Sequence, residues 1–230
     1  MLLLHHLVHT FSKIKISKYG ESGLLCDFGD KVTQDSTKCI WGIREQIQSI
    51  NGVLYAIHSY NTITVYFNNN TISASRLSDL IKQIKLTNSL ISSNKIWEIP
   101  VCYNAGYELD LTRISNYIGL TEKETIKSHC SKPLYMHGYG AGPGQPKYGN
   151  SDLCAPHRLA TPRVSIPAGS VGWVEHQGMI QANNSPGGWN IIGRTPIKMF
   201  DATSKDPCKI KPGDSIQFYP ITMEEFNAYC

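Results

Sequence analysis

Two arginines and one tryptophan lie in a segment of this chain that is rich in proline and glycine, and their types suit ligand binding. Arg163 follows a proline, Arg194 follows a glycine, and Trp189 follows two glycines. Glycine lets the backbone approach a ligand closely, and proline fixes its direction. A guanidinium group can bind a carboxylate or phosphate through two hydrogen bonds, and an indole ring can stack on a flat substrate. The same side chains could instead tie loops to backbone carbonyls or anchor a core, so both interpretations stay open.

A second candidate is the glycine-rich stretch at 138–144, GYGAGPG, which begins with Gly138 and Tyr139. Backbone N–H groups in such a stretch could cradle a phosphate. The Gly-Lys-Ser/Thr ending of a P-loop does not follow, and the context does not fit a dinucleotide-binding fingerprint. The stretch therefore predicts either a structural loop or a loop that contacts a ligand.

The eight histidines and seven cysteines contain no recognisable metal motif. Neither HExxH nor CxxC occurs, and no cysteine and histidine pair at ligand spacing. We therefore expect no metal site held by this chain and expect reduced thiols. His129 is a candidate general base, although a hydrogen-bonded structural histidine is the alternative interpretation.

The charge pattern excludes some partners. The formal net charge is +4, and no basic block or acidic tail is present. Neither nucleic acid nor an anionic membrane surface is indicated as a partner. No stretch approaches the ~20 apolar residues of a spanning helix. We expect a soluble, cytoplasmic protein.

Residues 13–100 alternate between strand and helix patterns. Helices are predicted at 33–49 and 73–85, the first with Ile40, Ile43 and Ile47 on one face. Strands are predicted at 13–18, 23–28, 53–57, 62–67 and 95–100. This order favours a ferredoxin-like α/β sandwich over residues 1–102.

The remaining residues have a different character. Residues 103–133 read as a helical connector with short helices at 110–118 and 121–128. From 134 to 230, short β-prone runs stand between proline- and glycine-rich turns, at 164–166, 171–174, 189–192, 197–200 and 216–219. They favour a small, mostly antiparallel β-barrel, so the predicted fold class is α+β.

Several motifs, in order along nearly the whole chain, resemble the allophanate hydrolase subunit 1 family, also called carboxyltransferase subdomain C and D. They are GESGLLCDFGD at 20–30, IPVCY at 99–103, ATPR at 160–163, IPAGSVG at 166–172, SPGGW at 185–189, IGRTP at 192–196 and PGDSIQF at 212–218. The resemblance implies a ferredoxin-like domain followed by a cyclophilin-like β-barrel. The stretch after Tyr139 is longer than the family's loop and differently spaced, which could alter the shape of a pocket.

The resemblance further implies a function. The chain would be one subunit of a heteromeric, ATP-dependent 5-oxoprolinase, inactive alone, that helps to activate 5-oxoproline for hydrolysis to L-glutamate. Its partners would be a larger carboxyltransferase-like subunit, with which it shares ATP and Mg²⁺, and a lactam-utilisation subunit. The alternatives are the carboxyltransferase part of a urea carboxylase and allophanate hydrolase system, or a Kip-type inhibitor that binds a sensor histidine kinase.

The same resemblance suggests residue roles. Arg163, Arg194 and His129 would serve catalysis. The residues expected to bind substrate or nucleotide are Gly138, Tyr139, Gln177, Ser185, Pro186, Gly187, Gly188 and Trp189.

Overall fold

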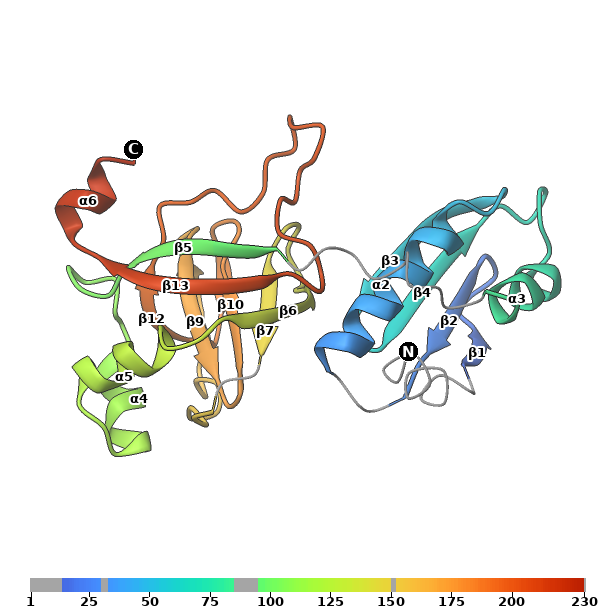
Figure 1. Ribbon diagram of the computed structural model, residues 1–230. Helices are drawn as coiled ribbons and strands as arrows, with labels where there is room; N and C mark the ends of the chain where they lie inside the picture. The colour runs from blue at the N-terminus through green and yellow to red at the C-terminus, as the bar shows by residue number, and fades with distance from the viewer. Residues whose placement is uncertain (1–13, 30–32, 85–94, 150–151, 230) are drawn as a thin grey trace. The chain divides into compact units, whose positions relative to one another are not determined.

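The structure is a computed structural model that describes residues 14–29, 33–84, 95–149 and 152–229. The chain divides into two compact units, Met1–Ser93 and Asn94–Cys230 (Figure 1). None of the helices in the described residues is long and apolar enough to cross a bilayer.

In its described residues, the first unit is a four-stranded antiparallel sheet with two helices. Its strands, in the spatial order β1-β2-β4-β3, are β1 (Lys15–Lys18), β2 (Gly23–Asp27), β3 (Val53–Ser59) and β4 (Thr62–Phe67). The helices are α2 (Gln34–Gln48) and α3 (Ala74–Lys82). Apolar residues of one sheet face pack with Ile40, Ile43 and Ile47 of α2 and with Leu77 and Ile81 of α3.

Local hydrogen bonds begin both helices where the sequence predicted them. The Thr33 side chain accepts from the Ser36 N–H, and the Ser36 side chain accepts from the Thr33 N–H. The Ser73 hydroxyl likewise accepts from the Arg76 N–H at the start of α3. These caps satisfy N–H groups that have no partner within a helix. The two helices and the hairpin of β3 and β4 are therefore confirmed.

The strand expected at 95–100 does not close the first sheet. It is β5 (Ile96–Cys102), which pairs in parallel with β13 (Ser215–Ile221) and antiparallel with β12 (Asn190–Arg194). The boundary between the compact units consequently falls near residue 93, and the placement of this strand in the first domain was wrong. Alternating polarity predicts a strand, but it does not say which sheet the strand joins.

The second unit is built around a closed seven-stranded barrel with the order β10-β7-β6-β13-β5-β12-β9 (Figure 1). The strands not yet introduced are β6 (Leu134–Tyr139), β7 (Pro146–Gly149), β9 (Ser170–Val174) and β10 (Gln177–Ile180). A separate two-stranded ribbon consists of β8 (Arg163–Ile166) and β11 (Ser185–Gly187). The chain thus has a mixed α/β fold with a closed barrel.

Three short helices accompany the barrel: α4 (Leu111–Ile118), α5 (Glu122–His129) and α6 (Met223–Asn227). The two helices expected between 103 and 133 are present, and Leu111 and Ile114 of α4 belong to the barrel core. This segment is therefore a packed part of the second unit. Of the five β-prone runs, the one at 197–200 is not a strand.

Candidate functional site

Arg163 lies beside the segment that carries the SPGGW motif. β8 pairs antiparallel with β11, so that Gly187 stands opposite Arg163, with a bulge between Ser185 and Gly187. Arg163 Nη1 donates to the Trp189 carbonyl oxygen at 3.4 Å. The first residues of the motif form one strand of a ribbon. The structure thus brings one predicted arginine together with the predicted binding segment.

A buried carboxylate holds Arg163 in place. Asp110 Oδ1 accepts from Arg163 Nη2 at 2.8 Å, and Asp110 Oδ2 accepts from the Ile191 N–H at 2.7 Å. The Asp110 N–H in turn donates to the Ile191 carbonyl at 2.8 Å. The side chain of Asp110 is 7% exposed and that of Arg163 is 28% exposed. Groups of the protein itself therefore occupy this guanidinium, which favours the structural interpretation of Arg163.

Trp189 is an anchor between the ribbon and the barrel. The ring is buried in a cluster with Ile166, Val174, Met179 and Ile191. The neighbours Trp173, Ile180 and Ile192 belong to the core inside the barrel. Because successive side chains of a strand point to opposite faces, the cluster of Trp189 lies on the outer face of the barrel. The contacts favour the core-anchor interpretation of this tryptophan over an open stacking platform.

Arg194 stands at the end of β12, where it pairs with Cys102 and Ser170 of the neighbouring strands. Its Nε donates to the Ala168 carbonyl at 2.9 Å. Its guanidinium carbon lies 5.3 Å from the centre of the Tyr107 ring and 5.7 Å from that of Phe226. The observed bond uses Nε, and an arginine has five N–H donors, so an anion contact at the other edge is compatible with this geometry.

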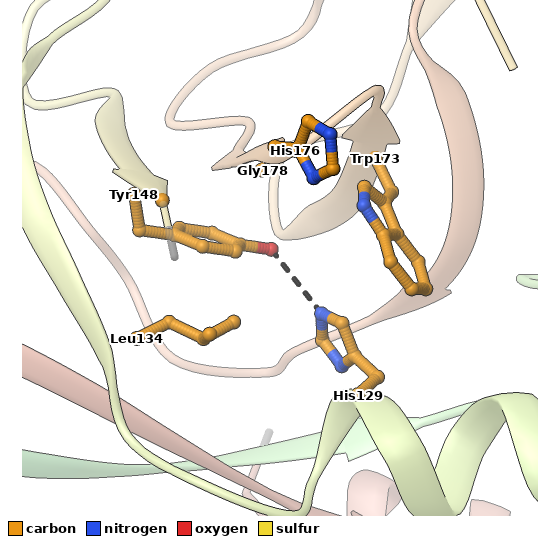
Figure 2. Close-up of a pocket in the computed structure, with 7 residues that line it drawn as sticks. His129, Leu134, Tyr148, Trp173, His176 and Gly178 are labelled. Atoms are coloured by element: carbon orange, nitrogen blue, oxygen red, sulfur yellow. Dashed lines mark hydrogen bonds between the residues drawn. The ribbon is translucent and has the colours of Figure 1, made fainter. Parts of the chain in front are cut away.

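His129 is enclosed in the barrel by aromatic rings (Figure 2). Its Nδ1 lies 2.7 Å from the Tyr103 hydroxyl and its Nε2 lies 3.5 Å from the Tyr148 hydroxyl. The imidazole stacks on Phe218 with 4.5 Å between ring centres. Burial lowers the pKa of His129 to about 3, because the barrel interior disfavours the charged imidazole.

A small cavity adjoins this histidine. It is lined by His129, Leu134, Tyr148, Gly149, Trp173, His176 and Gly178 (Figure 2). Only about 10 Å³ is open to the centre of a water molecule, which is room for about one water. A substrate does not fit there. The surroundings of His129 therefore favour the structural interpretation over a role as general base.

The glycine-rich stretch is a β-hairpin. Gly138 and Tyr139 end β6, and the Gly140 N–H donates to the Gln145 carbonyl at 2.7 Å across the turn. Gly138 pairs with Lys147 of β7. The Tyr139 hydroxyl donates to the Ile210 carbonyl at 2.8 Å. These backbone contacts favour the interpretation of the stretch as a structural loop over that of a loop that contacts a ligand.

The remaining predicted binding residues lie at strand ends and turns of the second unit. Gln177 begins β10 and is exposed, opposite Val174 of β9. The Ser185 hydroxyl accepts from the amide of buried Gln181. Gln181 also accepts from Gln145 at 2.8 Å. Ser185 is therefore tied to the hairpin of β6 and β7 through two buried amides.

Sequence reasoning missed three polar residues that the fold brings to this region. Asp110 stands directly before α4, where it resembles a helix cap, yet its side chain makes no cap bond and serves Arg163 and Ile191 instead. Lys147 and Arg158 both approach the ring of Trp189. Alternation of Lys147 with buried Tyr148 could have indicated an outward-facing lysine in β7.

The side chains of this region fit an anion better than a metal ion. No group of three metal-ligating side chains occurs within the described ranges. Asp110, the buried carboxylate of the region, is already paired with Arg163. The cationic side chains of Arg163, Arg194 and Lys147 suit a phosphate or carboxylate as ligand. Mg²⁺ needs side chains that offer oxygen atoms, which these cations lack.

The fold and the sequence together place the chain in a known family. It belongs to the family described as the carboxyltransferase domain, subdomain C and D, whose pattern matches residues 14–210. The family expected from the motifs is therefore confirmed.

Individual relatives extend this result. The chain is 32% identical over 204 residues to the 5-oxoprolinase B subunit of Escherichia coli O157:H7, a match that covers 87% of this chain and 93% of that protein. It is 26% identical over 232 residues to the 5-oxoprolinase B subunit of Bacillus subtilis strain 168, covering 94% and 97%. The solved urea carboxylase of Kluyveromyces lactis superposes with a TM-score of 0.71 at 18% identity, over 94% of this chain and 22% of that one. The last likeness concerns the fold alone.

Proposed function

We propose that this chain is the B subunit of a heteromeric 5-oxoprolinase. The observation that carries the proposal is the likeness, over nearly the full length of both proteins, to two bacterial proteins with that name. Its partners are a larger carboxyltransferase-like subunit and a subunit that completes ring opening. The chain acts in the assembly and is inactive alone.

The chemistry explains why ATP is needed. A lactam is a poor electrophile, because its nitrogen donates electron density to the carbonyl. Transfer of the γ-phosphoryl group of ATP to the lactam oxygen releases ADP and makes that oxygen part of a phosphate leaving group. Water then adds to the ring carbon, phosphate departs, and cleavage of the C–N bond with protonation of the nitrogen gives glutamate. Such a transfer depends mostly on positioning and on electrostatic stabilisation of the phosphoryl oxygens.

Within this chain the arginines have different roles. Arg163, paired with Asp110, is a positioning residue that fixes the segment from Ser185 to Trp189 against the barrel. Arg194 is the candidate contact for an anionic group of the substrates, and its bond to the Ala168 carbonyl and its place over the Tyr107 ring support this role. His129 supports the barrel interior. Mg²⁺ bound to the phosphates of ATP would offset their negative charge. We assign its protein ligands to the larger partner, because the described residues of this chain contain no group of three metal-ligating side chains.

In this proposal the first unit is ferredoxin-like and the barrel unit is cyclophilin-like, a fold that by itself fixes no function. Carboxyl transfer to urea is the second candidate, supported by the likeness of the fold to a urea carboxylase. The much higher coverage of the 5-oxoprolinase relatives favours the first candidate.

Reconstitution tests the proposal. The chain is co-expressed with its larger partner and the ring-opening subunit, and ADP and glutamate release are measured with 5-oxoproline or urea as substrate. We expect ATP hydrolysis that depends on 5-oxoproline and on the presence of this chain. ATP hydrolysis that depends on urea and not on 5-oxoproline would favour the second candidate. If neither substrate stimulates ATP hydrolysis in the complete complex, both candidates are refuted.

A further inference from the structure

Three segments that are distant in sequence converge on the ring of Trp189. Lys147 lies in β7, opposite Gly138 of β6 and Met179 of β10. Met179 shares the outer cluster with Trp189, so this face of the barrel carries both the lysine and the ring. Arg158 approaches from the segment that precedes β8.

Two cations stand close to this one ring. Lys147 Nζ lies 5.1 Å and Arg158 Cζ lies 5.0 Å from the centre of the Trp189 ring. A tryptophan face attracts cations, and the attraction grows where water is excluded. Trp189 is only 6% exposed, so the ring itself offers little surface for stacking a substrate. What the cluster presents is concentrated positive charge beside a fixed apolar ring.

The two cations also repel each other. Burial and the charge of Arg158 both lower the pKa of Lys147, burial being the larger cause. An anion bound beside these groups would offset this repulsion and would raise the pKa of the lysine again. The cluster therefore has an electrostatic reason to take up a negative group.

The backbone around Arg158 is held in position. The Leu159 N–H donates to the Gly188 carbonyl at 2.8 Å. The side-chain amide of buried Asn190 donates to the carbonyls of Pro156 at 3.0 Å and His157 at 3.3 Å. A site whose backbone is already fixed loses less conformational entropy when it binds a ligand.

A glycine adjoins the cluster. Gly188 lies directly before the ring, and a Cβ atom there would stand 3.4 Å from the Leu159 carbonyl oxygen and 3.8 Å from Arg158 Cβ. A larger side chain at this position would occupy the space beside the arginine.

We propose that Lys147 and Arg158, held at the ring of Trp189, bind an oxyanion: the carboxylate of the lactam substrate or a phosphoryl group of the nucleotide. The ligand assignment rests on the proposed function, whereas the anion site rests on the geometry. Arg158 supplies the planar fork that matches two oxygens of such a group, and Lys147 supplies a compact charge.

Amine footprinting tests the site independently of activity. The full chain, alone and in complex with its partner, is treated briefly with a low dose of acetic anhydride at neutral pH, and acetylation of each lysine is read by mass spectrometry. An anion that raises the pKa of Lys147 by one unit lowers its neutral fraction, and so its labelling rate, about tenfold. We expect such protection by saturating 5-oxoproline or inorganic phosphate, and the effective anion identifies the source of the oxyanion.

Matched controls make the result specific. Lys198, an exposed lysine near Asp201, should be labelled equally with and without anions. The neutral lactam 2-pyrrolidone, which lacks the carboxylate, should not protect Lys147. Arg158→Gln should weaken protection, whereas Lys198→Met should leave it unchanged.

The outcomes separate the two proposals. Failure of both anions to protect Lys147, in the chain and in the complex, or equal protection of Lys198, overturns the anion site. Protection of Lys147 in a complete complex that shows no ATP hydrolysis with 5-oxoproline supports the site and refutes the proposed function.

Discussion

Replacing Asp110 tests whether the contacts of Arg163 stabilise the barrel unit. In Asp110→Ala the Ile191 N–H loses a partner at 2.7 Å and Arg163 loses one at 2.8 Å. Leaving a buried N–H unpaired costs about 1–3 kcal/mol. Arg163 is 28% exposed and water can replace part of its bond, so its share is reduced to about 1 kcal/mol. We expect a total loss of about 3 kcal/mol, or roughly 10 °C in Tm for a unit of this size.

Urea unfolding followed by tryptophan fluorescence measures this loss. A Trp41→Phe background removes the tryptophan of the first unit, so that Trp97, Trp173 and Trp189 report on the second unit alone. Asp110→Asn keeps the shape and one acceptor oxygen, and should cost less than the alanine variant. The control is Asp152→Ala, which breaks an exposed pair with Lys132 and should cost less than about 1 kcal/mol.

A double-mutant cycle separates the pair from its surroundings. Arg163→Met, alone and with Asp110→Ala, should show a coupling of about 1 kcal/mol, because contacting charged residues are not independent. A loss in Asp110→Ala no greater than in Asp152→Ala would refute the reasoning. That result would mean that the Asp110 carboxylate does not hold the ribbon of β8 and β11 to the barrel. It would also mean that Arg163 is available to a ligand.

Three further outcomes are expected. Gly178→Ala should destabilise the barrel by about 2 kcal/mol or more in urea unfolding, because the added Cβ would stand 2.0 Å from a ring carbon of buried Tyr148. The control is Gly142→Ala, whose Cβ would have nothing within 4 Å and which should cost under about 0.5 kcal/mol. Similar losses of stability in the two variants would contradict the observed packing around Gly178. Because burial lowers the pKa of His129 to about 3, the folded chain binds fewer protons than the unfolded chain between about pH 6.5 and 3, so stability is complete above that range and is lost as the pH falls through it. His129→Phe should reduce the slope of stability against pH by up to about 1.4 kcal/mol per unit, and an unchanged slope would argue against a neutral buried imidazole. Arg194→Ala should remove turnover of the reconstituted complex while costing only about 1 kcal/mol of stability from its lost bond, and unaltered kcat/KM would assign this arginine to a structural role.

Some of the fold could be read from short stretches of sequence. The caps at Thr33 and Ser73 depend on hydrogen bonds between residues three positions apart, and the apolar face of α2 follows from its helical spacing. Such features are settled by neighbours along the chain. The motifs from 160 to 196 likewise indicated the family, because several of them occur in the expected order.

Partners of individual strands and side chains needed the closed barrel. The strand at 96–102 was expected in the first sheet, yet it runs parallel to β13 near the other end of the chain. Arg163 and Asp110 are 53 positions apart, and the sequence alone left open whether the arginine binds a ligand or the protein.

The sequence by itself determined helices α2, α3, α4 and α5, most of the strands it predicted and the family, whereas β6, β7, β10 and α6 were not predicted. The tertiary structure decided what each polar group of the second unit contacts: a carboxylate for Arg163, an aromatic box for His129, and a shared ring for Lys147 and Arg158. The physical reason is the separation along the sequence of the residues that interact. Caps and amphipathic faces form between residues a few positions apart, whereas these contacts exist only after barrel closure brings distant strands together.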